Sequence, residues 1–196
     1  MTTWPTCSTL KNEWSGPHAH ISLSRKALGE EKKAMLPSDH YVRFYNEIFK
    51  YLESQGHEHL EKYWLEISRL QESHLLENFR ENGLQGMYDY WDRIRIEENC
   101  DLTLELSDDC LASRMNMCPS LSKVLDNDAA PSPLYCDHCP GWVGPIMKKL
   151  GYYYLKEIGD PAVPRCAAWI YSNKGKAEEK IRELQNNKIE FKSYIE

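Results

Sequence analysis

The chain has 196 residues, which is enough for one domain that buries a core without cross-links. Hydrophobic residues make up 41% and charged residues 28%, a composition that excludes an intrinsically disordered chain. The net charge of −6 and the lack of a lysine or arginine block argue against nucleic acid as a partner, and no apolar run approaches the roughly 20 residues of a membrane span.

The first 37 residues are interrupted by proline and glycine, and they are expected to form an arm. The remainder, 38–196, is expected to be a single domain with a helical half at 38–98 and a cysteine-rich sheet half at 99–196. Because the first residues include no apolar signal region, a cytoplasmic location is expected. The seven cysteines are an odd number, and most of them are therefore interpreted as thiols.

Apolar residues recur at helical spacing through the first half of the domain. They predict a helix from Ser38 to about Gly56, a second from about Glu58 to Asn82, and a third over 84–96. The junction near Gly56 predicts an antiparallel pair of helices there.

The pattern then alternates, which predicts strands. A β-hairpin is expected over 102–118, a short helix over 120–125, a helix over 141–150, two paired strands at 152–158 and 166–172, and a charged helix over 174–187. The fold class is therefore α+β, with N-terminal helices packed on a small antiparallel sheet and a C-terminal helix. A narrow apolar stripe on that last helix (Ala177, Ile181, Leu184) makes it a candidate homodimer surface.

The strongest local motif is Cys136-Asp137-His138-Cys139. Cysteines at this spacing can bind one metal ion, and Cys118 or Cys166 could supply a third sulfur to a zinc site. The sequence lacks a second cysteine or histidine pair, so Cys136 and Cys139 are metal candidates without a complete ligand set.

The same motif fits nucleophilic catalysis, because a histidine next to a thiol lowers the thiol pKa and transfers protons. Asp137 could orient His138, and a helix that begins just after Cys139 would stabilise a thiolate there. Disulfide exchange is a third interpretation, and simple core packing is a fourth. Packing is preferred for Cys100 and Cys110.

The order of these elements resembles the L-2-amino-thiazoline-4-carboxylic acid hydrolase-like family over residues 100–172. The resemblance rests on Cys118-Pro119 after a strand, Tyr135-Cys136 after a short helix, a helix that ends at Gly151, and Cys166 before an apolar strand. It implies that Cys118, Cys136 and Cys166 match recurrent family cysteines and that Asp137 lies in an acidic neighbourhood. His138 and Cys139 are assigned from their chemistry alone.

The first hypothesis is a hydrolase that opens a cyclic C–N bond in a small thiazoline-like acid. Cys136 or Cys118 would attack, His138 would be the acid and base, and Asp137 would orient it. No cofactor is expected, unless zinc binds the cysteines. The alternative is a non-enzymatic sensor or carrier that holds a small ligand or a metal among aromatic side chains (Tyr63, Trp64, Tyr90, Trp91).

Overall fold

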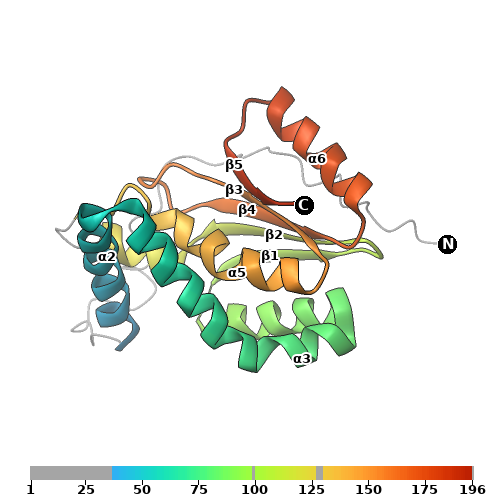
Figure 1. The fold of residues 1–196 in the computed structure, drawn as a ribbon, viewed down its shortest axis with the longest axis horizontal. Helices are drawn as coiled ribbons and strands as arrows, with labels where there is room; N and C mark the ends of the chain where they lie inside the picture. Colours follow the sequence, from blue (N-terminus) through green and yellow to red (C-terminus); the bar gives the residue numbers. More distant parts are fainter. Residues whose placement is uncertain (1–36, 99, 127–129, 196) are drawn as a thin grey trace.

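The computed structural model describes residues 37–98, 100–126 and 130–195. The predicted arm at 1–37 lies outside the described residues apart from Pro37. The predicted α+β class is confirmed: helices pack on a five-stranded sheet in which every strand pair is antiparallel (Figure 1). The described helices are α2 (Pro37–Gln55), α3 (His57–Glu97), α4 (Pro119–Leu125), η2 (Tyr135–Asp137, a 3₁₀ turn), α5 (His138–Lys149) and α6 (Lys174–Asn186). The strands are β1 (Asp101–Leu106), β2 (Cys110–Met117), β3 (Tyr153–Glu157), β4 (Cys166–Tyr171) and β5 (Phe191–Tyr194).

The sheet has helices on both faces, with strands in the order β1-β2-β4-β3-β5. Successive residues of a strand point to opposite faces. Ile170 in β4 therefore joins the core formed with α3 and α5, while its neighbour Trp169 joins the core under α6. Figure 1 shows α6 on one side of the sheet and α3 and α5 on the other. Because helices cover both faces of the middle strands, packing on each side holds the side chains of these strands in place.

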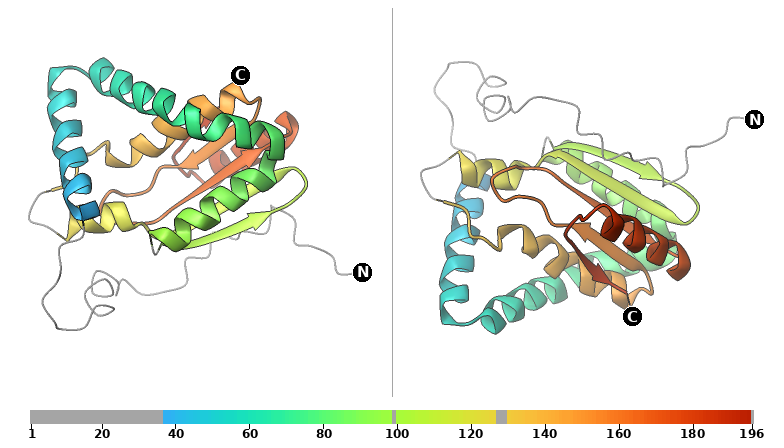
Figure 2. Two further views of the ribbon diagram at one scale, coloured as in Figure 1. Left: turned by 90° about the horizontal axis from the view of Figure 1, so that it is seen from below. Right: turned by 90° about the horizontal axis from the view of Figure 1, so that it is seen from above.

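Helix α3 reverses direction at Gly83, whose backbone is non-helical at φ 56° and ψ −140°. The rings of Phe79 and Trp91 lie 5.7 Å apart, whereas twelve residues of straight helix would separate them by roughly 18 Å. Figure 2 shows the two halves folded back on each other, and it shows α2 and α3 meeting at a corner. The antiparallel pair predicted at Gly56 is therefore wrong, because the reversal occurs at Gly83.

Helix α5 begins at His138, three residues earlier than predicted, and directly follows the 3₁₀ turn. Pro145 stands inside the helix without ending it. The chain leaves the helix through Gly151, whose φ of 77° is in the left-handed region. The early start places the whole Cys136–Cys139 motif on helical backbone at the amino end of α5.

Strand β5 was not predicted from the sequence. It pairs with β3, so that Lys192 lies opposite Lys156 and Tyr194 lies opposite Tyr154. Paired residues of neighbouring strands share a face. The last strand therefore adds a lysine and a tyrosine to the face of the sheet that α5 covers.

The apolar stripe of α6 is part of the core. Ala177 and Leu184 have no exposed surface, and Ile181 packs against the same cluster. The homodimer surface predicted from this stripe is therefore wrong, because the sheet of the same chain covers it.

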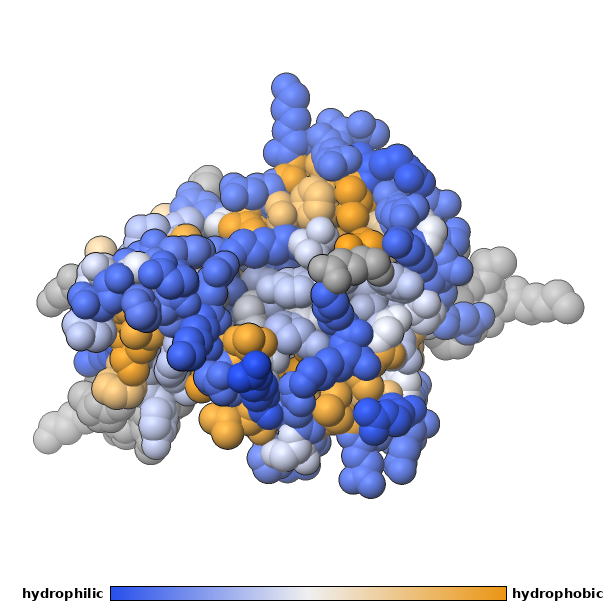
Figure 3. Space-filling model, in the orientation of Figure 1, coloured by the Kyte–Doolittle hydropathy of each residue, from blue (hydrophilic) through white to orange (hydrophobic). Residues whose placement is uncertain are grey.

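The surface shown in Figure 3 is mainly hydrophilic, with apolar side chains in patches between charged ones. Helix α2 contributes three exposed aromatic side chains, Tyr41, Phe44 and Tyr51, each more than 60% exposed. Among the described helices, none combines the length and apolar character that crossing a membrane requires.

We expect Gly83→Ala to destabilise the fold by about 1–3 kcal/mol, because a side chain disfavours this backbone conformation. The added Cβ would also lie 3.1 Å from the Tyr152 hydroxyl. The free energy of unfolding in urea measures the loss. Gly175→Ala is the matched control, since this helical glycine has no positive φ and its Cβ would lie 3.2 Å from the end of the Asn173 side chain. An equal or larger loss in that control would contradict the importance of the Gly83 backbone conformation.

Candidate functional site

Four half-buried free thiols gather where β2 ends, β4 begins and α5 starts: Cys118, Cys136, Cys139 and Cys166. Cys139 is the strongest charged neighbour of both Cys118 and Cys136, and Cys166 also acts on both. The charged neighbours of Cys100 are instead Glu98, Lys123 and Arg95. The four thiols thus form one electrostatic cluster, here called the thiol cluster, and Cys100 lies outside it.

The side chain of His138 contacts the sulfur of Cys139 directly. The distance from Cys139 Sγ to His138 Nε2 is 3.4 Å, and His138 Nδ1 is hydrogen-bonded to the backbone carbonyl of Tyr135. Because a carbonyl oxygen only accepts, Nδ1 must carry a proton. In the neutral ring, Nε2 is then the free acceptor that faces the thiol. The backbone of the 3₁₀ turn therefore fixes the tautomer that can remove the thiol proton.

Aromatic rings hold the imidazole in place. The ring centroids of Trp142, Tyr135 and Phe49 lie 4.6, 5.0 and 5.6 Å from that of His138. His138 is only 7% exposed. With its orientation set by both packing and a hydrogen bond, the histidine has little freedom to turn away from Cys139.

A buried lysine on β3, Lys156, lies beside the thiol cluster and is only 5% exposed. It pairs in register with Ala168, which makes Cys166 its diagonal neighbour on the same face of the sheet. Burial by itself lowers the pKa of Lys156. The neighbouring Cys166, which is hydrogen-bonded to Lys156, acts in the opposite direction together with Cys139 and Tyr154, and the pKa is raised as a result. Lys156 therefore stays protonated and places a positive charge next to the sulfurs.

The thiols of the cluster differ in acidity. Burial is the main cause that raises the pKa of Cys118 and of Cys136 to about 12. Burial acts on Cys139 in the same direction, but His138 and Lys156 outweigh it and lower the pKa of Cys139 to about 7. Of these three, Cys139 is the thiol that ionises at neutral pH. The expected nucleophiles Cys136 and Cys118 are protonated there, which makes them weaker candidates.

The Tyr135 carbonyl, and not the Asp137 side chain that was expected to orient His138, accepts the hydrogen bond of His138 Nδ1. The Asp137 carboxylate instead accepts a hydrogen bond from Lys192 Nζ at 2.6 Å. The acidic residue of the motif thus ties the start of α5 to the last strand of the sheet.

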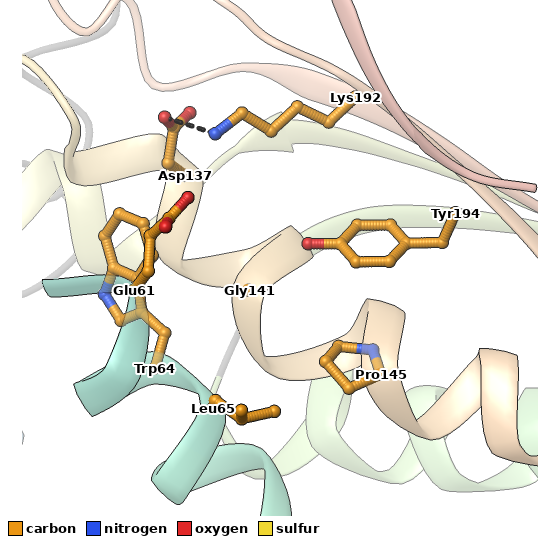
Figure 4. A pocket seen from close by; sticks show the side chains of 8 residues that line it. All are labelled: Glu61, Trp64, Leu65, Asp137, Gly141, Pro145, Lys192 and Tyr194. Carbon is orange, nitrogen blue, oxygen red and sulfur yellow. Dashed lines mark hydrogen bonds and ion pairs between the residues drawn. The ribbon is translucent and has the colours of Figure 1, made fainter. Parts of the chain in front are cut away.

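This ion pair stands at one end of a pocket of about 170 Å³. Figure 4 shows Glu61, Asp137 and Lys192 gathered at that end, with Tyr194 entering from the other side. The remaining lining residues are Trp64, Leu65, Gly141 and Pro145. A Cβ at Gly141 would touch the Trp64 side chain, and one at Gly144 would overlap the Tyr194 ring. The two glycines let Trp64 and Tyr194 pack close to α5.

Within the described residues, no group of three or more histidine, cysteine, aspartate or glutamate side chains is arranged to hold a metal ion. The zinc site predicted at Cys136 and Cys139 thus has no ligand set there. No family model, curated protein or solved structure matches the chain, so no relative supplies a ligand set either. The resemblance stated above stays a prediction.

Sequence reasoning missed Lys156, Lys192 and the Tyr135 carbonyl. A lysine in an alternating strand is expected on the wet face, and a backbone acceptor leaves no side-chain signal. The three consecutive tyrosines before Leu155 are the only hint that the strand is covered on both sides.

We expect iodoacetamide to alkylate Cys139 with a pH midpoint near 7, because only the thiolate reacts. The rate should rise as pH increases through that value. His138→Asn keeps a donor for the Tyr135 carbonyl but lacks the Nε2 acceptor, so its midpoint should move to higher pH. Mass spectrometry in a Cys136→Ser background measures the rate at Cys139. An unchanged midpoint in the asparagine variant would contradict the assigned contact.

Lys156→Met should also move the alkylation midpoint of Cys139 to higher pH, since it removes a neighbouring positive charge. Methionine fills a similar volume, and Cys139 can take up a proton once the ammonium is gone, so no unpaired buried charge remains and the free energy of unfolding should change little. Lys180→Met is the control, because that buried lysine pairs with Glu183 and Trp169 instead. A shift of the Cys139 alkylation midpoint in Lys180→Met but not in Lys156→Met would refute the role of Lys156.

Proposed function

We propose that the chain is a small-molecule hydrolase in which Cys139 is the nucleophile and His138 is the general acid and base. The observation that carries the proposal is the contact between Cys139 Sγ and a His138 ring whose tautomer is fixed by the Tyr135 carbonyl. A nucleophile, a base at hydrogen-bond distance and a third group that orients the base are the arrangement of thiol hydrolases. Here a backbone oxygen takes the place of the orienting side chain.

The substrate class comes from the family resemblance, which implies a cyclic C–N bond in a thiazoline-like acid. The Cys139 thiolate would add to the amidine-like ring carbon, and the electron pair of its C=N bond would move to nitrogen. His138, protonated by removal of the thiol proton, would then donate a proton to that nitrogen. The electron pair of the exocyclic nitrogen would then form a C=N bond as the ring C–N bond breaks, while His138 carries a proton from the exocyclic nitrogen to the leaving ring nitrogen. Water, deprotonated by His138, would add to this carbon, and collapse of the adduct would expel the Cys139 thiolate.

Two further features support this reaction. The ammonium of Lys156 favours the thiolate form of Cys139, and Cys139 lies in the first turn of α5, where the helix dipole stabilises negative charge. The neighbouring pocket combines the Lys192 ammonium, two carboxylates and the Trp64 ring, which suits a small substrate that carries both charge and a flat ring. Cys118, Cys136 and Cys166 would surround the nucleophile without attacking.

That pocket also favours a second candidate function, binding of a small ligand without turnover. The aromatic side chains first considered for a carrier mostly fill the core: the Phe79 ring packs against Tyr90 and Trp91, and Trp64 is 3% exposed. Trp64 is the one of these four that lines the pocket. A carrier would therefore bind its ligand at Asp137 and Lys192, and its affinity would not depend on Cys139.

The test is hydrolysis of a set of thiazoline and related cyclic amidine carboxylates, followed by release of the ring-opened product. Cys139→Ser and His138→Asn should abolish turnover, while Cys136→Ser should retain most of it. Cys100→Ser is the control, because this half-buried thiol lies outside the thiol cluster. Ligand binding by calorimetry without turnover in the native chain would favour the carrier, and full activity in Cys139→Ser would refute the nucleophile.

A further inference from the structure

We propose that the thiol cluster also reduces small hydroperoxides, with Cys139 attacking the peroxide and Cys136 closing a disulfide with it. This second activity rests on Cys139 as the reactive thiol of the proposed function, but it uses a different partner residue and a different substrate. Both cysteines lie at the junction between the 3₁₀ turn and α5.

Cys136 lies in the 3₁₀ turn Tyr135–Asp137, and Cys139 follows three residues later in the first turn of α5. Asp137 and His138 between them have helical φ and ψ, and side chains at i and i+3 are neighbours on one face of helical backbone, so this junction places both thiols on one side. Cys139 is also the strongest charged neighbour of Cys136. In a helical turn the two Cα atoms are spaced within the range that a disulfide spans.

The other two thiols of the cluster are held by different partners. Cys118 caps α4, where its sulfur accepts a hydrogen bond from the Leu121 amide at 3.4 Å. Cys166 is hydrogen-bonded to the buried Lys156. Forming a disulfide at either position would break one of these contacts. Cys136, one turn before Cys139 on the same backbone, is the partner that needs the least rearrangement.

The chemistry is balanced without a metal or cofactor. The Cys139 thiolate attacks the terminal oxygen of ROOH, the O–O bond breaks, and the departing RO⁻ takes the proton of His138 to give ROH and Cys139–SOH. The Cys136 thiol then attacks the sulfenic sulfur, and its proton leaves with the hydroxide as water. The sum is two thiols and ROOH giving a disulfide, ROH and water. An external dithiol returns the pair to the reduced state.

Burial selects for small peroxides. Cys139 is only partly exposed and its base His138 is 7% exposed. A bulky lipid hydroperoxide would have to displace packed rings to reach the sulfur, whereas hydrogen peroxide is little larger than water. The site is therefore assigned to hydrogen peroxide and short alkyl hydroperoxides.

The experiment treats the reduced, desalted full-length chain with hydrogen peroxide and maps the thiols by mass spectrometry of tryptic peptides. Cleavage after Lys123 and Lys148 leaves Cys136 and Cys139 on one peptide, whereas Cys118 and Cys166 fall on two others. The expected product is this single peptide lacking two hydrogens. With dithiothreitol present, the native chain should consume peroxide continuously, and Cys139→Ser should consume it no faster than buffer.

In Cys136→Ser the sulfenic acid should accumulate at Cys139 and be trapped by dimedone, and Cys100→Ser should behave like the native chain. A disulfide that joins the Cys139 peptide to the Cys118 or Cys166 peptide would overturn the pairing, and unchanged thiols would overturn the activity. If Cys139 is still alkylated near pH 7 and cyclic amidines are still hydrolysed, the failure concerns the peroxide reaction alone. Loss of alkylation as well would remove both proposals.

Discussion

The arrangement of the candidate site depends on the positive charge of Lys156, which is enclosed between the sheet and α5. An isolated ammonium moved into a protein interior carries a desolvation penalty of several kcal/mol, so the groups around it must supply negative charge. The described groups beside it are the thiols of Cys139 and Cys166 and the hydroxyl of Tyr154. Of these, Cys139, whose pKa is lowered to about 7, supplies negative charge at neutral pH. The register of β3 against β4 and β5 fixes where the ammonium lies, and the sulfurs surround it.

The thiols of the cluster have different pKa values because their surroundings differ. Cys136 and Cys139 are three residues apart, yet the pKa of Cys136 is about 12 and that of Cys139 about 7. The difference follows from which of them touches the imidazole of His138, and the Tyr135 carbonyl keeps that imidazole in the useful tautomer. The 3₁₀ turn therefore contributes in two ways, through its carbonyl and through the placement of Cys136.

Helical spacing and strand alternation predict most of the described elements, because they report local burial directly. They do not report where a chain reverses direction. In the sequence, Gly56 and Gly83 are equally good candidates for the reversal, and the contact between the Phe79 and Trp91 rings places it at Gly83. Strand β5 escapes prediction because four residues with two polar side chains, Lys192 and Ser193, carry too short a pattern. At the candidate site, the motif falls at the start of α5, and its contacts depend on where this helix begins, which the sequence places three residues too late.

Strand β5 lies at an edge of the described sheet, with β3 as its partner and only four residues in length. Short edge segments open with the smallest free energies in native-state hydrogen exchange. Opening of β5 would withdraw Lys192 and Tyr194 together, so one local event removes the cation and the ring from the pocket. Lys192 is partly exposed, so added salt weakens its ion pair with Asp137 and makes the opening of β5 easier. The shape and charge of this pocket are thus coupled to ionic strength through the fraying of a single strand.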